Sequence, residues 1–162
     1  AVTSLWARRP RRSALPAIIP RAILRSTRKI IKERKGESSW SRSFICKHCG
    51  NIIAKVKDTG VPVICCGEPM SEIIPGTTDA AVEKHVPVWT VENGIVHVKV
   101  GSVEHPMLPE HYIEWVSLHT EQGNQRKELH PGEKPEVCFA LCEGDEVEAV
   151  YAYCNLHGLW KA

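Results

Sequence analysis

The fold class is decided by the stretch Val86-Pro87-Val88-Trp89-Thr90-Val91-Glu92-Asn93-Gly94-Ile95-Val96-His97-Val98-Lys99-Val100. It contains two runs rich in β-branched residues, and in the second run apolar side chains alternate with polar ones. Between the runs, Asn93-Gly94 supplies the positive φ angles that a type I′ turn needs. The stretch therefore predicts a β-hairpin.

Further strand patterns follow the hairpin, at 111–119, 136–142 and 147–153. They are separated by segments rich in Gly, Pro and Asn, and no long helical periodicity competes with them. Several short strands of this kind predict an antiparallel sandwich or barrel of about 85 residues. A core of that size is thin, so metal ligation would add stability.

Length and composition set outer limits on the kind of protein. At 162 residues, with 43% hydrophobic and 25% charged residues, the chain fits one medium or two small globular domains. It contains no run of 18 apolar residues, which excludes a membrane-spanning helix. Seven cysteines without an export signal favour free thiols and metal ligands over disulfides, so we expect a cytoplasmic protein.

The formal charge of +2 hides a strong asymmetry along the chain. Residues 1–43 carry twelve Lys or Arg against two Glu, whereas residues 44–162 carry nine basic against seventeen acidic groups. The basic segment could be an organelle-targeting peptide, an arm for nucleic acid or phospholipid, or a non-native extension. We favour the last, because no initiator Met precedes it and Lys35-Gly36-Glu37 could be a translated ribosome-binding site. We expect it to be disordered and nucleic acid not to be a partner.

Four cysteines early in the acidic part have the spacing of a metal site. A C-x-x-C pair brings two sulfurs to one ion when a small residue such as Gly50 allows the turn. An adjacent pair must be strained before both of its sulfurs can reach the same ion. Zinc and iron both accept four thiolates. The pattern therefore predicts a tetrahedral site without naming its metal, and its ligands are Cys46, Cys49, Cys65 and Cys66.

Several other histidines and cysteines are not predicted to be ligands. His97 alternates with valines on a strand and is expected to face solvent, while His119 and His130 remain unassigned. Cys138 and Cys142 would share one face of a strand, and their default is burial as small apolar groups. None of these residues enters the predicted sites.

The remaining donors form a second metal-site pattern. His105 and His111 flank a Pro-containing loop that can fold them toward one point, and Cys154 with His157 makes a C-x-x-H turn. With His85, four imidazoles and one thiolate can fill five positions around a metal and leave the sixth vacant. A vacant position on a metal is where chemistry takes place.

Taken in order, these segments resemble the desulfoferrodoxin family of two-iron superoxide reductases. The resemblance rests on DAAVEKHVPV at 79–88, HPM at 105–107 with HYIEW at 111–115, and YCNLHGLWK at 153–161. It covers about residues 44–162, and every ligand position of the family pattern is filled.

The resemblance implies an all-β fold in two parts. Residues 44–76 would form a small desulforedoxin-like module that holds one iron through the four cysteines, although zinc could occupy that site. Residues 77–162 would form an immunoglobulin-like antiparallel β-sandwich that holds a second, catalytic iron. Its equatorial ligands would be His85, His105, His111 and His157, with Cys154 axial.

The implied activity is the one-electron reduction of superoxide to hydrogen peroxide at that ferrous centre. Rubredoxin or a similar carrier would re-reduce the iron, and the chain would form a homodimer. Lys84 is expected to steer the anion and organise proton-delivering water, and Glu83 to occupy the sixth position of the oxidised iron. Two alternatives are a two-iron electron-transfer protein and a zinc-stabilised interaction module with a nucleic-acid-binding arm.

Overall fold

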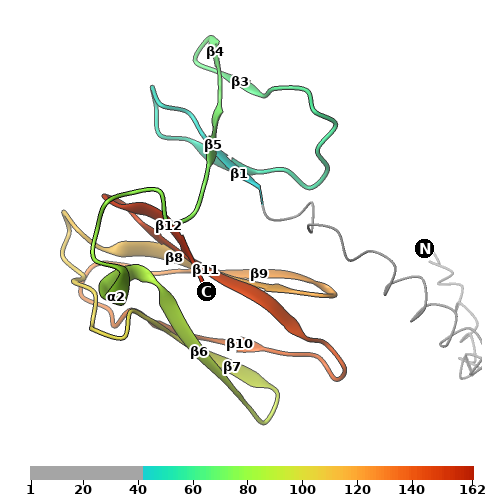
Figure 1. Cartoon of the computed structure of the whole chain (residues 1–162), viewed down its shortest axis with the longest axis vertical. Coiled ribbons are helices and arrows are strands. Elements are labelled where there is room, and N and C mark those ends of the chain that lie inside the picture. The colour runs from blue at the N-terminus through green and yellow to red at the C-terminus, as the bar shows by residue number, and fades with distance from the viewer. Residues whose placement is uncertain (1–41) are drawn as a thin grey trace, which may run out of the picture. The chain divides into compact units, whose positions relative to one another are not determined.

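The computed structural model describes residues 42–162, so the expectations for the basic segment concern residues that lie almost wholly outside the described part. The described chain is nearly all β, with antiparallel sheets (Figure 1). No helix in residues 42–162 is both long and apolar enough to cross a membrane. The predicted all-β fold is confirmed.

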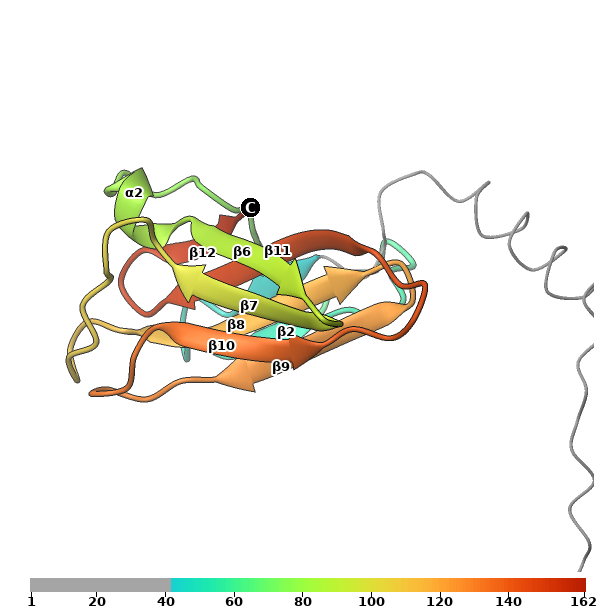
Figure 2. The same cartoon turned by 90° about the horizontal axis from the view of Figure 1, so that it is seen from below.

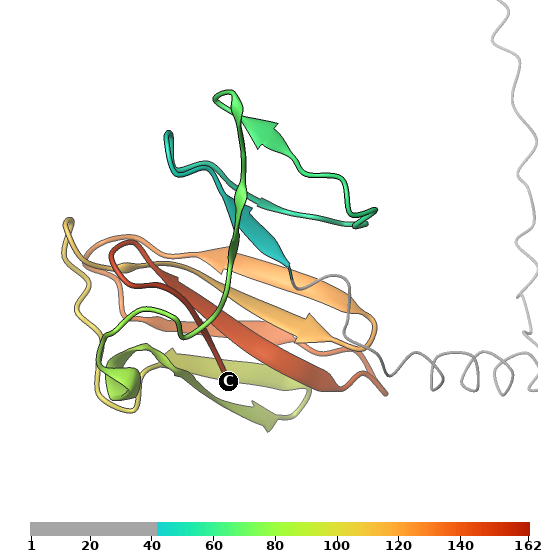
Figure 3. The same ribbon diagram turned by 45° about the horizontal axis from the view of Figure 1, so that its top comes forward.

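Two antiparallel sheets face each other across the main core (Figures 2 and 3). The first sheet has the order β10-β7-β6, with β6 at Pro87–Glu92, β7 at Ile95–Val100 and β10 at Glu136–Ala140. The second has the order β12-β11-β8-β9, with β8 at Ile113–Thr120, β9 at Gly123–Glu128, β11 at Val147–Cys154 and β12 at Gly158–Lys161.

Alternation along the strands decides which side chains fill the core. On β7, Val96, Val98 and Val100 are buried while the residues between them are exposed. Phe139 and Leu118 meet these valines in the same cluster, one from each sheet. Burial of one face per strand is the pattern of a two-layer sandwich, so the hydrophobic effect holds the sheets together.

The predicted hairpin is present. Asn93 and Gly94 have φ angles of 50° and 75°, and β6 pairs with β7 in the register Glu92↔Ile95. The three later strand predictions correspond to β8, β10 and β11, with β10 ending two residues earlier than expected. β9 was not predicted, because all of its residues are polar or Gly and exposed, so it carries no alternation.

The expected burial of Cys138 and Cys142 is wrong, because both residues are exposed. In β10 the larger apolar side chains of Val137 and Phe139 face the core, and strand alternation then turns Cys138 to the outer face. Cys142 lies beyond the end of the strand.

Residues 42–76 form a smaller group of short strands. The sheet order is β2-β1-β5, beside a two-stranded pair β3-β4. Ile52 and Ile73 pack against a second apolar cluster, built from side chains of β11 and β12, and the Gly76 N–H donates to the Leu159 carbonyl at 2.8 Å. The strands are β1 Ser43–Ile45, β2 Ile52–Ala54, β3 Ile64–Cys65, β4 Glu68–Pro69 and β5 Ser71–Ile73.

A close backbone contact fixes the short helix α2 (Val82–His85) against the end of β7. The Gly101 N–H donates to the Val86 carbonyl at 3.1 Å, and the Val103 N–H donates to the Glu83 carbonyl at 3.0 Å. Gly101 is buried with φ of 83°, and a Cβ there would meet the Val103 carbonyl oxygen and lie 2.6 Å from that of Lys84. Only glycine allows this approach.

We therefore expect Gly101→Ala to lower the free energy of unfolding by about 2–4 kcal/mol, from left-handed strain plus overpacking against backbone. Gly132→Ala is the matched control, because its φ is 85° and nothing lies within 4 Å of a Cβ built there. It should cost about 1 kcal/mol. Urea unfolding followed by circular dichroism measures both, and equal losses would show that the contact with α2 is unimportant.

Candidate metal centres

Three separate parts of the sandwich bring five donors together at one place. His85 ends α2, His105 and His111 lie in the connection between β7 and β8, and Cys154 and His157 lie at the turn between β11 and β12. One ligand atom from each residue lies within 4.8 Å of those of the others. The structure thus brings together all five donors that the sequence singled out.

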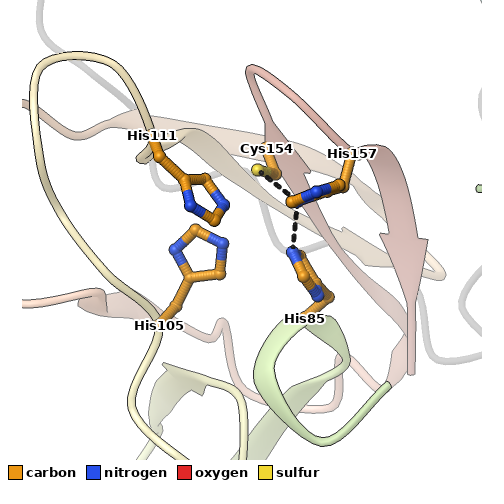
Figure 4. A group of neighbouring side chains, drawn as sticks. All are labelled: His85, His105, His111, Cys154 and His157. Carbon is orange, nitrogen blue, oxygen red and sulfur yellow. Dashed lines mark hydrogen bonds between the residues drawn. The ribbon is translucent and has the colours of Figure 1, made fainter. Parts of the chain in front are cut away.

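The four imidazoles form a nearly square ring (Figure 4). The order around the square is His85, His105, His111 and His157. Along its four sides, in that order and back to His85, the centroids of neighbouring imidazoles are 4.7, 4.6, 4.8 and 4.7 Å apart. Across the square, His85 and His111 are 6.3 Å apart. Neighbouring rings stand 75–81° to one another, so each ring meets its neighbours in a T-shaped arrangement.

Backbone hydrogen bonds decide which ring nitrogens are free. The Nδ1–H of His85 donates to the Ala81 carbonyl at 2.7 Å, and that of His105 donates to the Pro106 carbonyl at 2.6 Å. Each bond leaves Nε2 as a lone-pair donor, which is how metal-binding histidines are commonly oriented. The Nε2 atoms of His105 and His111 are buried without a hydrogen-bond partner.

Those orphaned nitrogens are the observation that a metal would explain. A buried polar atom without a partner is destabilising, and here two such atoms face a common point beside His85 Nε2 and His157 Nδ1, which are 2.9 Å apart. A cation at that point would accept all four lone pairs. The donor set therefore fits a metal ion.

Burial keeps the imidazoles in the form that binds metal. Burial lowers the pKa of His105 to about 4, and it also lowers the pKa values of His85 and His111. All three are therefore neutral near pH 7. Neutral imidazole is the metal-ligating form, so the rings are ready to bind without losing protons.

Cys154 adds one sulfur to the four nitrogens. Its side chain is fully buried, and its Sγ lies 3.5 Å from His157 Nδ1 (Figure 4). Burial raises the pKa of its thiol, while the backbone N–H groups of Leu156 and His157 act in the opposite direction. Metal ligation deprotonates a thiol, so binding here would release one proton.

Two neighbouring side chains hold the donor-bearing loops in place, and sequence reasoning missed both. The Asn155 side chain accepts the Tyr112 N–H at 3.0 Å and donates to the Glu110 carbonyl at 3.0 Å, which ties the His111 loop to the C-x-x-H turn. The Trp160 ring stacks on His85 with centroids 4.9 Å apart, and its Nε1–H donates to the His157 carbonyl. Both residues lie inside the YCNLHGLWK stretch, and their place in that stretch was the sequence signal that could have indicated their role.

The four early cysteines also converge. Cys49 Sγ lies 3.6 Å from Cys65 Sγ, and Cys65 Sγ lies 4.0 Å from Cys66 Sγ. Metal–sulfur bonds of about 2.3 Å at tetrahedral angles place sulfurs roughly 3.8 Å apart, so the spacing fits one ion. Cys66 has a φ of 52°, which is the strain expected of adjacent ligands and turns both sulfurs to one side.

The four thiols affect one another's pKa values in opposite directions. Backbone N–H groups of Cys49 and His48 lower the pKa of Cys46 to about 6. Hydrogen bonds with the neighbouring sulfurs raise the pKa of Cys66 to about 12 and also raise that of Cys65. A metal ion bound by all four sulfurs would balance the combined negative charge of the thiolates.

Glu83 and Lys84 have exposed side chains on α2, immediately before His85. The positive charge of Lys84 acts to lower the pKa values of both His85 and His111, although burial is the larger cause. Lys84 therefore contributes positive electrostatic potential at two of the four imidazoles. Neither residue belongs to the five-donor cluster.

The remaining histidines stay outside both clusters. His97 and His130 are exposed, and His119 is partly buried with its Nε2 3.1 Å from Ser117 Oγ. The expectation that His97 faces solvent is confirmed.

Comparison with known proteins gives consistent matches. The desulfoferrodoxin family model matches residues 77–162. Desulfoferrodoxins of Syntrophotalea carbinolica and Nitratidesulfovibrio vulgaris are 46% and 47% identical over 119 residues, covering 74% of this chain and 93% of each relative. The crystal structure of superoxide reductase from Treponema pallidum aligns with a TM-score of 0.64 and 46% identity, covering 75% of this chain and 98% of the other. The chain belongs to the desulfoferrodoxin family.

Proposed function

We propose that this chain is a superoxide reductase, which converts superoxide to hydrogen peroxide by adding one electron and two protons. The observation that carries the proposal is the square of four imidazoles joined by one buried thiol. Family membership and the likeness to the Treponema pallidum enzyme support it.

We propose iron for this site, with His85, His105, His111, His157 and Cys154 as its ligands. When bound, a ferrous ion supplies the single electron that the reaction needs. Five protein donors are one fewer than an octahedral ion accepts, so one position remains for a small anion. Four neutral imidazoles and one thiolate leave a ferrous site positively charged, which favours an anionic substrate.

The chain's own residues attract the anion and arrange its protonation. Lys84 extends from α2 beside the imidazole ring, where its charge raises the local concentration of superoxide. Its ammonium group can also order the water molecules that supply the two protons. Glu83, on the same turn, is the carboxylate nearest in sequence to His85 and would cap the vacant position once the metal is oxidised.

The wider organisation proposed here has two parts. Residues 44–76 hold a second iron through Cys46, Cys49, Cys65 and Cys66, with zinc as the other candidate, and residues 77–162 carry the catalytic iron. The four-cysteine iron is auxiliary, and rubredoxin or a similar carrier in the cytoplasm restores the electron. The protein works as a homodimer.

The iron-loaded full chain should consume superoxide and yield one hydrogen peroxide per superoxide, without releasing oxygen. The expected stoichiometry follows because each superoxide gains one electron and none is oxidised. Pulse radiolysis with peroxide and oxygen detection measures it. Cys66→Ser, which alters only the four-cysteine site, should keep this activity, whereas His157→Ala should lose it. Visible iron–thiolate colour without superoxide consumption would instead identify an electron carrier.

Lys84→Ala should slow superoxide capture about threefold at low ionic strength, because one positive charge beside the site is lost. The rate should also depend less on salt, since screening acts on that attraction. Lys57→Ala removes the same charge from the segment that holds the four cysteines and should leave the rate unchanged. Identical salt profiles for the unaltered chain and the Lys84 variant would remove Lys84 from the mechanism.

Glu83→Ala should change the absorption spectrum of the oxidised protein and leave the rate of superoxide capture nearly unchanged. The reason is that a carboxylate would bind the vacant position only after the electron has left. Glu104→Ala, which removes a carboxylate next to His105, is the control. An unaltered oxidised spectrum in the Glu83 variant would show that this carboxylate does not reach the metal.

A further inference from the structure

A cysteine and a histidine meet on the outer face of the sandwich, away from both metal clusters. Cys138 in β10 lies directly opposite His97 in β7, and both side chains are exposed. Cys138 Sγ is 3.2 Å from His97 Nδ1, which is within hydrogen-bonding distance for sulfur and nitrogen. The pairing is fixed by the strand register, so the two groups are held together by backbone rather than by flexible loops.

The surroundings of this pair are open, and they combine polar with apolar side chains. Thr90 lies opposite His97 on β6, and the next cross-strand pair on the same face joins Lys99 to Glu136. These residues line a groove of about 570 Å³ on the outer face of the sheet. Small solutes therefore reach the sulfur directly, with an ammonium group and a hydroxyl nearby.

We propose that Cys138 and His97 form a nucleophilic thiol–imidazole pair that hydrogen peroxide oxidises to a sulfenic acid. A nucleophile and a base within hydrogen-bond reach are the usual arrangement for activating a thiol, because the imidazole can take its proton and leave the reactive thiolate. A sulfenic acid is the first, reversible step of cysteine oxidation.

The reaction balances with one peroxide molecule. The Cys138 proton moves to His97 Nδ1, and the thiolate sulfur attacks one peroxide oxygen. A sulfur–oxygen bond forms as the oxygen–oxygen bond breaks, which oxidises sulfur by two electrons. The departing hydroxide takes the proton from the imidazolium and leaves as water, so His97 is regenerated.

The source of the peroxide rests on the proposed function, since hydrogen peroxide is the product released at the iron. The reactivity of the pair does not rest on it. Peroxide added as a reagent therefore tests the pair even if the chain does not reduce superoxide, and the two failures remain distinguishable.

Cys142 provides a control within the same chain. It is also exposed and lies four residues further on, but no hydrogen bond to its sulfur occurs in residues 42–162. A difference in reactivity between Cys138 and Cys142 therefore measures the effect of the His97 imidazole rather than the effect of exposure alone.

The experiment treats the iron-loaded full chain with dilute hydrogen peroxide and a reagent that captures sulfenic acids, followed by peptide mass spectrometry. Cys138 should be labelled at least about fivefold faster than Cys142, because only Cys138 has a base in contact. His97→Gln should reduce Cys138 labelling to the rate of Cys142 and leave Cys142 unchanged. Circular dichroism checks that the variant keeps its fold. Equal labelling of the two cysteines, or no effect of His97→Gln, would overturn the proposal.

Discussion

The convergence of four imidazole lone pairs on one point constrains the whole sandwich. His105 and His111 each bury a ring nitrogen without a hydrogen-bond partner, which a thin core tolerates poorly. A cation shared by all four rings would remove that cost and would also join α2 to the loops that follow β7 and β11. Binding of such a cation would therefore contribute directly to the folding free energy of this end of the sandwich.

Local patterns could predict the hairpin and three further strands of the sandwich, because these strands of the main core carry clear signals. The alternating valines of β7 and the Asn93-Gly94 turn define both the hairpin and its inner face. β9 could not be predicted, since its residues are all polar or Gly and its pairing with β8 depends on the neighbouring strand. The error at Cys138 arose because alternation shows that two faces differ without showing which one meets the core.

The candidate metal site also has parts that the sequence could predict and parts that it could not. Its five donors could be found from spacing and resemblance, because ligand chemistry restricts the residue types to His and Cys. The side chains that orient them could not, since Asn155 and Trp160 act through contacts that form only in the folded chain. Gly101 belongs with them, because the close approach of β7 to α2 exists only in three dimensions.

The order of donors along the chain governs how the two sites are made during protein synthesis. The hydrogen-bonded pair His85 and His157 is 72 residues apart, so the five-donor cluster cannot close until residue 157 has left the ribosome. The four cysteines are complete much earlier, at Cys66. A growing chain therefore exposes a complete set of four thiols before it exposes the complete set of five donors, so the cysteine site is the first that could take up metal.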